Sequence, residues 1–149
     1  MQDGEGLTHL FPSPLRLAGA DLAVLGMPNA RAVAVASLAG AISADPTMFS
    51  RGASLDEAIA KLRLLPGIGE WTAQYIAMRE LREPDAFPAA DIGLMRAMMA
   101  ADGRRPSPAE LLSRAERWRP WRAYAALHLW AAGIVHPASS AKTHERQAA

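Results

Sequence analysis

The sequence predicts an all-α fold. Segments rich in alanine and leucine follow recognisable helix start signals, such as the pairs Ser54–Glu57 and Ser107–Glu110, which have capping-box spacing. No segment of useful length alternates apolar and polar residues as a half-buried strand does. The chain has 149 residues, of which 50% are hydrophobic and 21% charged. This length and composition are typical of one globular domain with its own core.

The first half of the chain alternates expected helices with turns. The segment GLTHLFPSPLRLAG, residues 6–19, has no cap and no helix before it, and the first expected helix follows it. Pro28 suits the first turn of an alanine-rich helix, and Gly26 stops the short helical turn before it. A Pro-Gly-Ile-Gly turn separates the last two helices of this half. Helices are therefore expected at about residues 20–25, 27–42, 54–63 and 70–81.

The second half begins with the segment REPDAFPAA, residues 82–90. We expect it to be extended, because its two prolines push their predecessors out of the helical region. Asp91, Ser107 and Pro120 are start signals for three further helices. These helices are expected to end near residues 101, 118 and 135. Residues 136–149 are polar and are predicted to form a frayed tail.

Composition excludes several classes of protein. No run of 18 or more apolar residues is present, which argues against a membrane span, and the N-terminus does not resemble a signal peptide. A cytoplasmic location is therefore expected. The absence of cysteine excludes disulfides, thiolate zinc sites and iron–sulfur clusters. The four histidines show no ligand spacing, so we expect no metal held by side chains and no cofactor.

Basic residues gather in one segment, although the net charge is only +1. The segment RAERWRPWR, residues 114–122, interleaves arginines with two tryptophans. Such a pattern suits a nucleic-acid surface, but most charged runs are simply solvated helix ends. Taken alone, the segment favours the solvated helix end.

Two glycines, Gly67 and Gly69, lie at the start of the helix expected at 70–81. They do not form a dinucleotide fingerprint, because Thr72 replaces the third glycine and no strand precedes the turn. Unpaired N–H groups and the helix dipole at such an end can hold a phosphate, with Thr72 adding a hydroxyl. The glycines can equally serve only the sterics of a tight turn. The residues alone slightly favour the steric explanation.

Three segments together resemble one family. They are LPGIGEWTAQYIAM, then DAFPAADIGLMRAM, and finally AERWRPWRAYAALHLWAAG. In this order they resemble the helix-hairpin-helix DNA glycosylase superfamily, in its DNA-3-methyladenine glycosylase II branch. The resemblance covers about residues 6–135. It implies a partial glycosylase domain at residues 1–135, with the hairpin at about 55–81 and the catalytic loop and helix at about 84–101. The family's N-terminal α/β domain and first helix pair are not found.

The resemblance assigns chemistry to individual residues. Asp91 matches the catalytic aspartate, whose carboxylate would stabilise the positive charge that develops on the sugar; as a lone residue it is an ordinary helix cap. Trp71, Tyr75 and Met78 share one helix face, which is typical either of a core stripe or of a pocket wall for a flipped base. Trp71, Tyr75 and Trp130 match family pocket aromatics, and we expect Tyr75 and Trp130 to contact the base.

The resemblance also implies a reaction and a partner. Trp71 stands where the lyase branches carry the lysine that forms a Schiff base, so a monofunctional enzyme is expected. It would flip alkylated purines such as 3-methyladenine out of double-stranded DNA and hydrolyse the N-glycosidic bond. A monomer associated with the bacterial nucleoid is expected. The alternatives are a non-catalytic hairpin module that binds DNA and an inactive truncated fragment.

The hairpin is assigned the contacts with the DNA backbone. Gly67, Gly69 and Thr72 are the predicted backbone-binding residues. The family hairpin can also hold a monovalent cation through main-chain carbonyls. By position these carbonyls belong to Arg63, Leu65 and Ile68.

Overall fold

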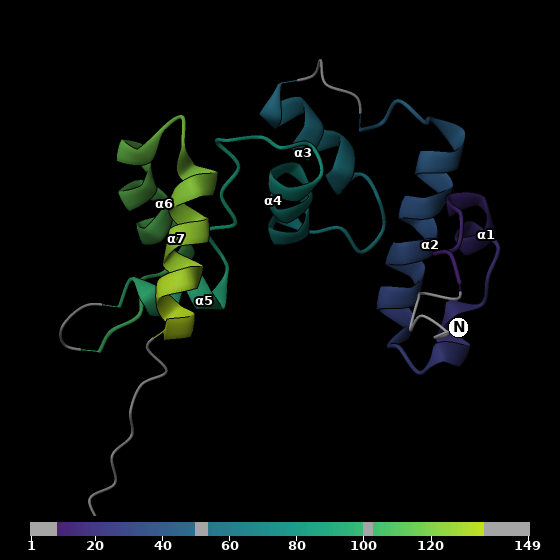
Figure 1. Cartoon of the computed structure of the whole chain (residues 1–149), viewed down its shortest axis with the longest axis horizontal. Coiled ribbons are helices and arrows are strands. Elements are labelled where there is room, and N and C mark those ends of the chain that lie inside the picture. The colour runs from purple at the N-terminus through teal and green to yellow at the C-terminus, as the bar shows by residue number, and fades with distance from the viewer. Residues whose placement is uncertain (1–8, 50–53, 100–102, 136–149) are drawn as a thin grey trace, which may run out of the picture. The chain divides into compact units, whose positions relative to one another are not determined.

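The computed structural model describes residues 9–49, 54–99 and 103–135 (Figure 1). Within these residues all regular structure is helical, as the sequence predicts. The elements are α1 (Pro14–Ala18), the 3₁₀ helix η1 (Leu22–Leu25), α2 (Asn29–Ala44), α3 (Leu55–Arg63), α4 (Glu70–Arg79), α5 (Ile92–Ala97), α6 (Pro108–Ala115), the 3₁₀ helix η2 (Glu116–Trp118) and α7 (Arg122–Val135).

The chain divides into two compact units. The first unit comprises Met1–Arg82 and contains α1 to α4, and the second comprises Glu83–Ala149 and contains α5 to α7. Of the helices in the described residues, none is long and apolar enough to cross a bilayer. The predicted frayed tail at 136–149 lies outside the described residues.

Two helix pairs make up the first unit. α1 packs on α2, and α3 packs on α4 to form a hairpin (Figure 1). The predicted capping box opens α3: the Glu57 N–H donates to Ser54 Oγ, and the Ser54 N–H donates to the Glu57 carboxylate at 2.9 Å. Ile59 and Leu62 of α3 are buried, as are alanines of α4, so the hairpin has an apolar interior.

Helix α1 was not expected from the sequence. Its N-cap is Ser13, whose Oγ accepts a hydrogen bond from the Arg16 N–H, and Pro14 occupies the first helical position. A helix of five residues is too short to show an apolar period. The Ser13–Pro14 pair is therefore the local signal that marks this helix in the sequence.

The second unit has a core formed by Leu94, Leu111, Ala115 and Ala126, all with 0% exposure. The second predicted capping box is also present, since the Glu110 N–H donates to Ser107 Oγ and the Ser107 N–H to the Glu110 carboxylate. All three helices of this unit are shorter than expected. α5 ends at Ala97, α6 passes into η2 after Ala115, and α7 begins at Arg122 instead of Pro120.

Candidate functional site

The two glycines of the hairpin turn serve different purposes. Gly67 has φ 78°, in the left-handed region that favours glycine. A Cβ atom added there would lie 2.7 Å from the Cβ of Ala34 and 3.4 Å from the Ala30 carbonyl oxygen, both on α2. The turn thus packs closely on α2, and sterics alone account for Gly67.

Gly69 has neither of these reasons to be glycine. Its φ of −86° suits any residue, and a Cβ atom added there would meet nothing within 4 Å. Gly69 is the N-cap of α4, and no side chain caps that end of the helix. The first turn of α4 therefore begins at an open main-chain surface that includes Thr72. Such a helix end can receive an anion at its N–H groups.

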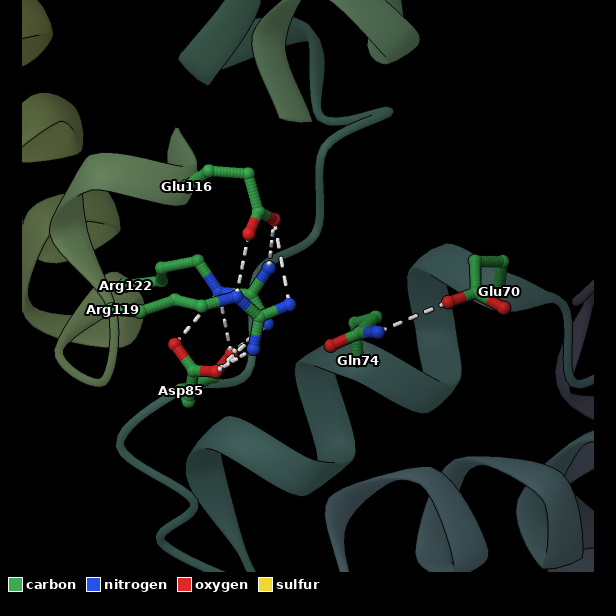
Figure 2. A network of polar contacts seen from close by, with 6 residues as sticks. All are labelled: Glu70, Gln74, Asp85, Glu116, Arg119 and Arg122. Atoms are coloured by element: carbon green, nitrogen blue, oxygen red, sulfur yellow. Dashed lines mark hydrogen bonds and ion pairs between the residues drawn. The ribbon is translucent and has the colours of Figure 1, made fainter. Parts of the chain in front are cut away.

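A carboxylate also lies in this first turn. Glu70 forms an ion pair with Arg63 at 3.1 Å. Figure 2 shows its second contact, in which Glu70 Oε1 accepts a hydrogen bond from Gln74 Nε2 at 3.0 Å. A negative side chain at a helix N-terminus stabilises the helix but repels an anion. The Arg63 guanidinium offsets that repulsion, and both side chains are more than half exposed.

The predicted cation site is at the same turn. The Leu65 carbonyl accepts the Ile68 N–H at 3.1 Å, which closes the turn, and Ile68 is 8% exposed. Binding of a monovalent cation by the carbonyls of Arg63, Leu65 and Ile68 stays a prediction. Across the described ranges of the chain, no cluster of three or more His, Cys, Asp or Glu side chains could hold a metal.

Trp71 and Tyr75 of α4 form an exposed aromatic pair. Their rings are stacked, with centroids 5.3 Å apart and an interplanar angle of 14°, and the two residues are 39% and 36% exposed. Met78, on the same helix face, is buried. The stripe therefore divides into one core residue and a flat aromatic surface. Contact of this surface with a base stays a prediction.

The loop before Asp91 is folded, not extended as the sequence predicted. The Ala86 N–H donates to the Glu83 carbonyl, and the Asp91 N–H donates to the Pro88 carbonyl at 2.9 Å, which closes two turns. Pro84 is the second residue of the first turn, where its fixed φ is favourable. Ala86, Phe87 and Pro88 are buried. Packing thus fixes the loop that leads into Asp91.

Two arginines hold this loop: Arg122, the first residue of α7, and Arg119, which follows η2 (Figure 2). The side chain of Arg122 is only 6% exposed; it donates to both carboxylate oxygens of Asp85 and to the Asp85 carbonyl, at 2.7–3.1 Å. Arg119 pairs with Asp85 and Glu116, and its hydrogen bond holds the pKa of the Glu116 carboxyl below the usual value. The Ala123 N–H also donates to a carbonyl of the loop.

This network corrects the interpretation of the segment RAERWRPWR. Arg114 donates to the Met98 carbonyl at the end of α5, while Arg119 and Arg122 bind Asp85. Trp118 packs edge-on against Phe87, with ring centroids 6.1 Å apart. Much of the segment therefore anchors the second unit internally, whereas the sequence favoured a solvated helix end. Met98 and Asp85 are distant from these arginines in sequence, so no local pattern could reveal them as partners.

Asp91 is the N-cap of α5, as predicted. Its Oδ1 accepts the Leu94 N–H at 2.9 Å and the indole Nε1–H of Trp130 at 2.8 Å. Trp130 belongs to α7, and both side chains are partly buried. The sequence singled out the two residues separately, but it did not predict their hydrogen bond. Two N–H donors on one oxygen stabilise the ionised carboxylate and fix its orientation.

The predicted site residues fall in both units. In each unit the structure brings one pair together: Trp71 with Tyr75, and Asp91 with Trp130. The remaining candidates, which belong to the first unit, are Arg63, Leu65, Gly67, Ile68, Gly69 and Thr72. The assignments of these residues to catalysis, to the base pocket and to the DNA backbone stay predictions.

Comparisons with known proteins place this geometry in context. The chain is 39% identical over 140 residues to a probable bifunctional transcriptional activator/DNA repair enzyme AlkA of Mycobacterium tuberculosis, covering 94% of this chain and 28% of that protein. It is 39% identical over 123 residues to DNA-3-methyladenine glycosylase 2 of Escherichia coli, covering 80% of this chain and 42% of that protein.

A solved structure is also similar. The 3-methyladenine DNA glycosylase Mag1 of Schizosaccharomyces pombe, in complex with abasic DNA, matches with a TM-score of 0.69 and 25% identity, over 80% of this chain and 62% of that chain. The chain is thus similar in sequence and in fold to part of several DNA-3-methyladenine glycosylases. The resemblance predicted from the sequence is confirmed, and the helical architecture agrees with the helix-hairpin-helix fold.

The similarity covers only part of these relatives. The chain spans 28% and 42% of the length of the two curated relatives described above. A DNA-3-methyladenine glycosylase of Bacillus subtilis, 33% identical over 130 residues, is covered over 41% of its length. No family model matches the sequence.

Proposed function

We propose that this chain contributes the DNA-binding hairpin and the catalytic carboxylate of a DNA glycosylase that removes alkylated purines such as 3-methyladenine. The observation that carries the proposal is the carboxylate of Asp91, held by two N–H donors at the end of a loop that buried residues and Arg122 keep in place. The similarity to 3-methyladenine glycosylases supports the choice of substrate.

Asp91 would act by electrostatics. Cleavage of an N-glycosidic bond leaves positive charge on the sugar, as in glycoside hydrolysis, and an ionised carboxylate beside that charge lowers the barrier. The hydrogen bonds from Leu94 and Trp130 support this role, because they keep the carboxylate oriented before the reaction begins. A preoriented group needs no reorganisation in the transition state.

Trp71 determines the type of reaction. An indole cannot form the Schiff base on which strand-cleaving glycosylases depend, so the product would be an intact strand with an abasic site. The stacked pair of Trp71 and Tyr75 offers a flat, exposed aromatic surface. Such a surface attracts cationic bases such as 3-methyladenine. We assign Tyr75 and Trp130 to contacts with the flipped base.

The test of the catalytic proposal is Asp91→Asn. We expect base excision in single-turnover assays on alkylated DNA to slow by about 100-fold or more. The melting temperature should change little, because asparagine is also a good N-cap. Asp45→Asn is the matched control. The Asp45 carboxylate, like that of Asp91, accepts a hydrogen bond from a nearby main-chain N–H, in this case that of Thr47. Equal excision rates for wild type and Asp91→Asn would reduce Asp91 to a structural cap.

The hairpin is tested separately through Gly69→Asp. Its backbone angles suit any residue and aspartate is a preferred N-cap, so this variant should remain folded. The added charge at the phosphate site should weaken duplex DNA binding in fluorescence anisotropy titrations, most clearly at low salt. Gly19→Asp adds the same charge outside the hairpin as a control. Unchanged affinity for Gly69→Asp would remove the hairpin from DNA binding.

Because DNA is the proposed partner, the protein would act where the chromosome lies, which in a bacterium is the cytoplasm. We infer that it acts as a monomer, which sedimentation can check. Binding of duplex DNA without excision would favour the alternative, a non-catalytic hairpin module.

A further inference from the structure

Gly93 occupies the second position of α5, directly after the cap and Ile92. A glycine within a helix loses more conformational entropy on folding than an alanine would, so its presence requires a reason. Gly93 does not have a positive φ and is exposed, so neither a left-handed turn nor close packing of the core explains it. Its surroundings offer an explanation of another kind.

An added Cβ atom at Gly93 would meet the two groups that define the Asp91 site. It would lie 3.0 Å from Asp91 Oδ1, 3.2 Å from Trp130 Cδ1 and 3.3 Å from Trp130 Nε1. Ordinary van der Waals contacts of a Cβ atom lie at 3.4–4 Å, so at these distances the neighbouring atoms would have to move by a few tenths of an ångström. An alanine at this position would push on both partners of the 2.8 Å hydrogen bond between Trp130 and Asp91.

Because Gly93 has no side chain, the edge of the Trp130 indole can lie against the first turn of α5. Trp130 reaches this place from α7, which packs against α5. Because α7 and α5 are held by the buried core, Trp130 cannot retreat from an added methyl group without strain in that core. The side chains of Trp130 and Asp91 would have to part instead.

We propose that Gly93 is a positioning residue, which allows the Trp130 indole to orient the carboxylate of Asp91. The meaning of this role for catalysis rests on the proposed function, but the contact itself does not. The role explains why a residue that weakens a helix lies beside its cap. It also gives Trp130 a second task besides contact with a base.

The first test needs no enzymatic activity. In ¹H–¹⁵N spectra of the full 149-residue chain, Trp130→Phe identifies the Trp130 indole resonance. In Gly93→Ala this resonance should move upfield and its proton should exchange faster with solvent, because the hydrogen bond to Asp91 lengthens. The matched control is Gly40→Ala in α2, where the added Cβ would meet only Ala18 Cβ, at 3.9 Å. It should leave the resonance in place.

Thermal melts give an independent readout. Gly40→Ala should raise the melting temperature, as an alanine for glycine exchange within a helix normally does. Gly93→Ala should lower it, because the contact strain exceeds that gain. An unmoved Trp130 resonance together with a melting temperature raised as in Gly40→Ala would overturn the proposal.

Kinetics then separate this proposal from the proposed function. In single-turnover base excision, Gly93→Ala should be at least about tenfold slower than wild type, with unchanged affinity for duplex DNA. It should add no further loss in a Trp130→Phe background, because the hydrogen bond is already absent there. If the wild-type chain excises no base, the proposed function fails, while the indole resonance and the melts still decide whether Gly93 positions Trp130 and Asp91.

Discussion

Replacing Gly67 by alanine tests the account of the hairpin turn most directly. Gly67 combines φ 78° with an added-Cβ distance of only 2.7 Å to Ala34 Cβ. Gly26, at the end of η1, has the same φ of 78°, but an added Cβ there would meet nothing within 4 Å. The pair therefore separates the cost of the backbone conformation from the cost of packing on α2.

The expected magnitudes follow from these two terms. An L-residue in the left-handed region costs about 1–2 kcal/mol, and both variants should lose this amount. Only Gly67→Ala must also relieve a contact that is about 1 Å too short, which is an overpacking cost of about 1–3 kcal/mol. We therefore expect Gly67→Ala to lower the free energy of unfolding by about 2–5 kcal/mol. Both substitutions also reduce the conformational entropy of the unfolded chain by the same amount, so this effect cancels when the two variants are compared.

Urea denaturation followed by circular dichroism measures both variants under the same conditions. The decisive quantity is the difference between the two losses, which should be at least about 1 kcal/mol. Equal losses for Gly67→Ala and Gly26→Ala would show that the turn does not pack on α2, and the steric account of Gly67 would be wrong.

Two further predictions concern charged side chains of the second unit. Arg122→Met should lower the free energy of unfolding, measured in urea, by about 3 kcal/mol, because it leaves the largely buried Asp85 carboxylate without its main partner. The control is Arg104→Met, which removes an exposed ion pair with Glu110 and should change stability little. Equal losses for the two variants would contradict the importance of the buried Arg122–Asp85 pair. The hydrogen bonds from Arg104 and then Ser107 hold the pKa of Glu110 at about 2, below its usual 4.5. The ionised Glu110 therefore contributes its full stabilisation above pH 4.5, and this contribution is lost as the pH falls towards 2. The difference in free energy of unfolding between wild type and Glu110→Gln should shrink over the same pH range. A difference that does not depend on pH would refute the ion pair.

Local signals in the sequence predicted most of the helix starts. Both capping boxes and the cap at Asp91 depend on bonds between residues three apart, so a short sequence window contains all the information they need. Helix ends were predicted less well. α5 stops at Ala97, where the carbonyl of the next residue accepts a hydrogen bond from Arg114 of α6, and nothing in the local sequence announces that partner.

Residue types also sufficed to nominate the candidate site. Asp91 after a proline-containing loop, the aromatic residues of α4 and the glycine-rich turn were all recognisable from their order along the chain. The folding of the loop 83–90 was not, because proline favours turns as well as extended backbone, and burial of Phe87 and Pro88 decides between them.

By itself, then, the sequence determined the helical class, the local caps and the family resemblance of this protein. Only the tertiary structure decided which contacts these residues make: that Gly67 packs on α2 while Gly69 leaves a helix end open, that Arg122 holds Asp85 from 37 positions away, and that Trp130 donates to Asp91 across 39 positions. The physical reason is that caps and turns are formed by neighbours in the chain. The contacts that orient a carboxylate or close a gap over a glycine join residues that meet only when the helices pack.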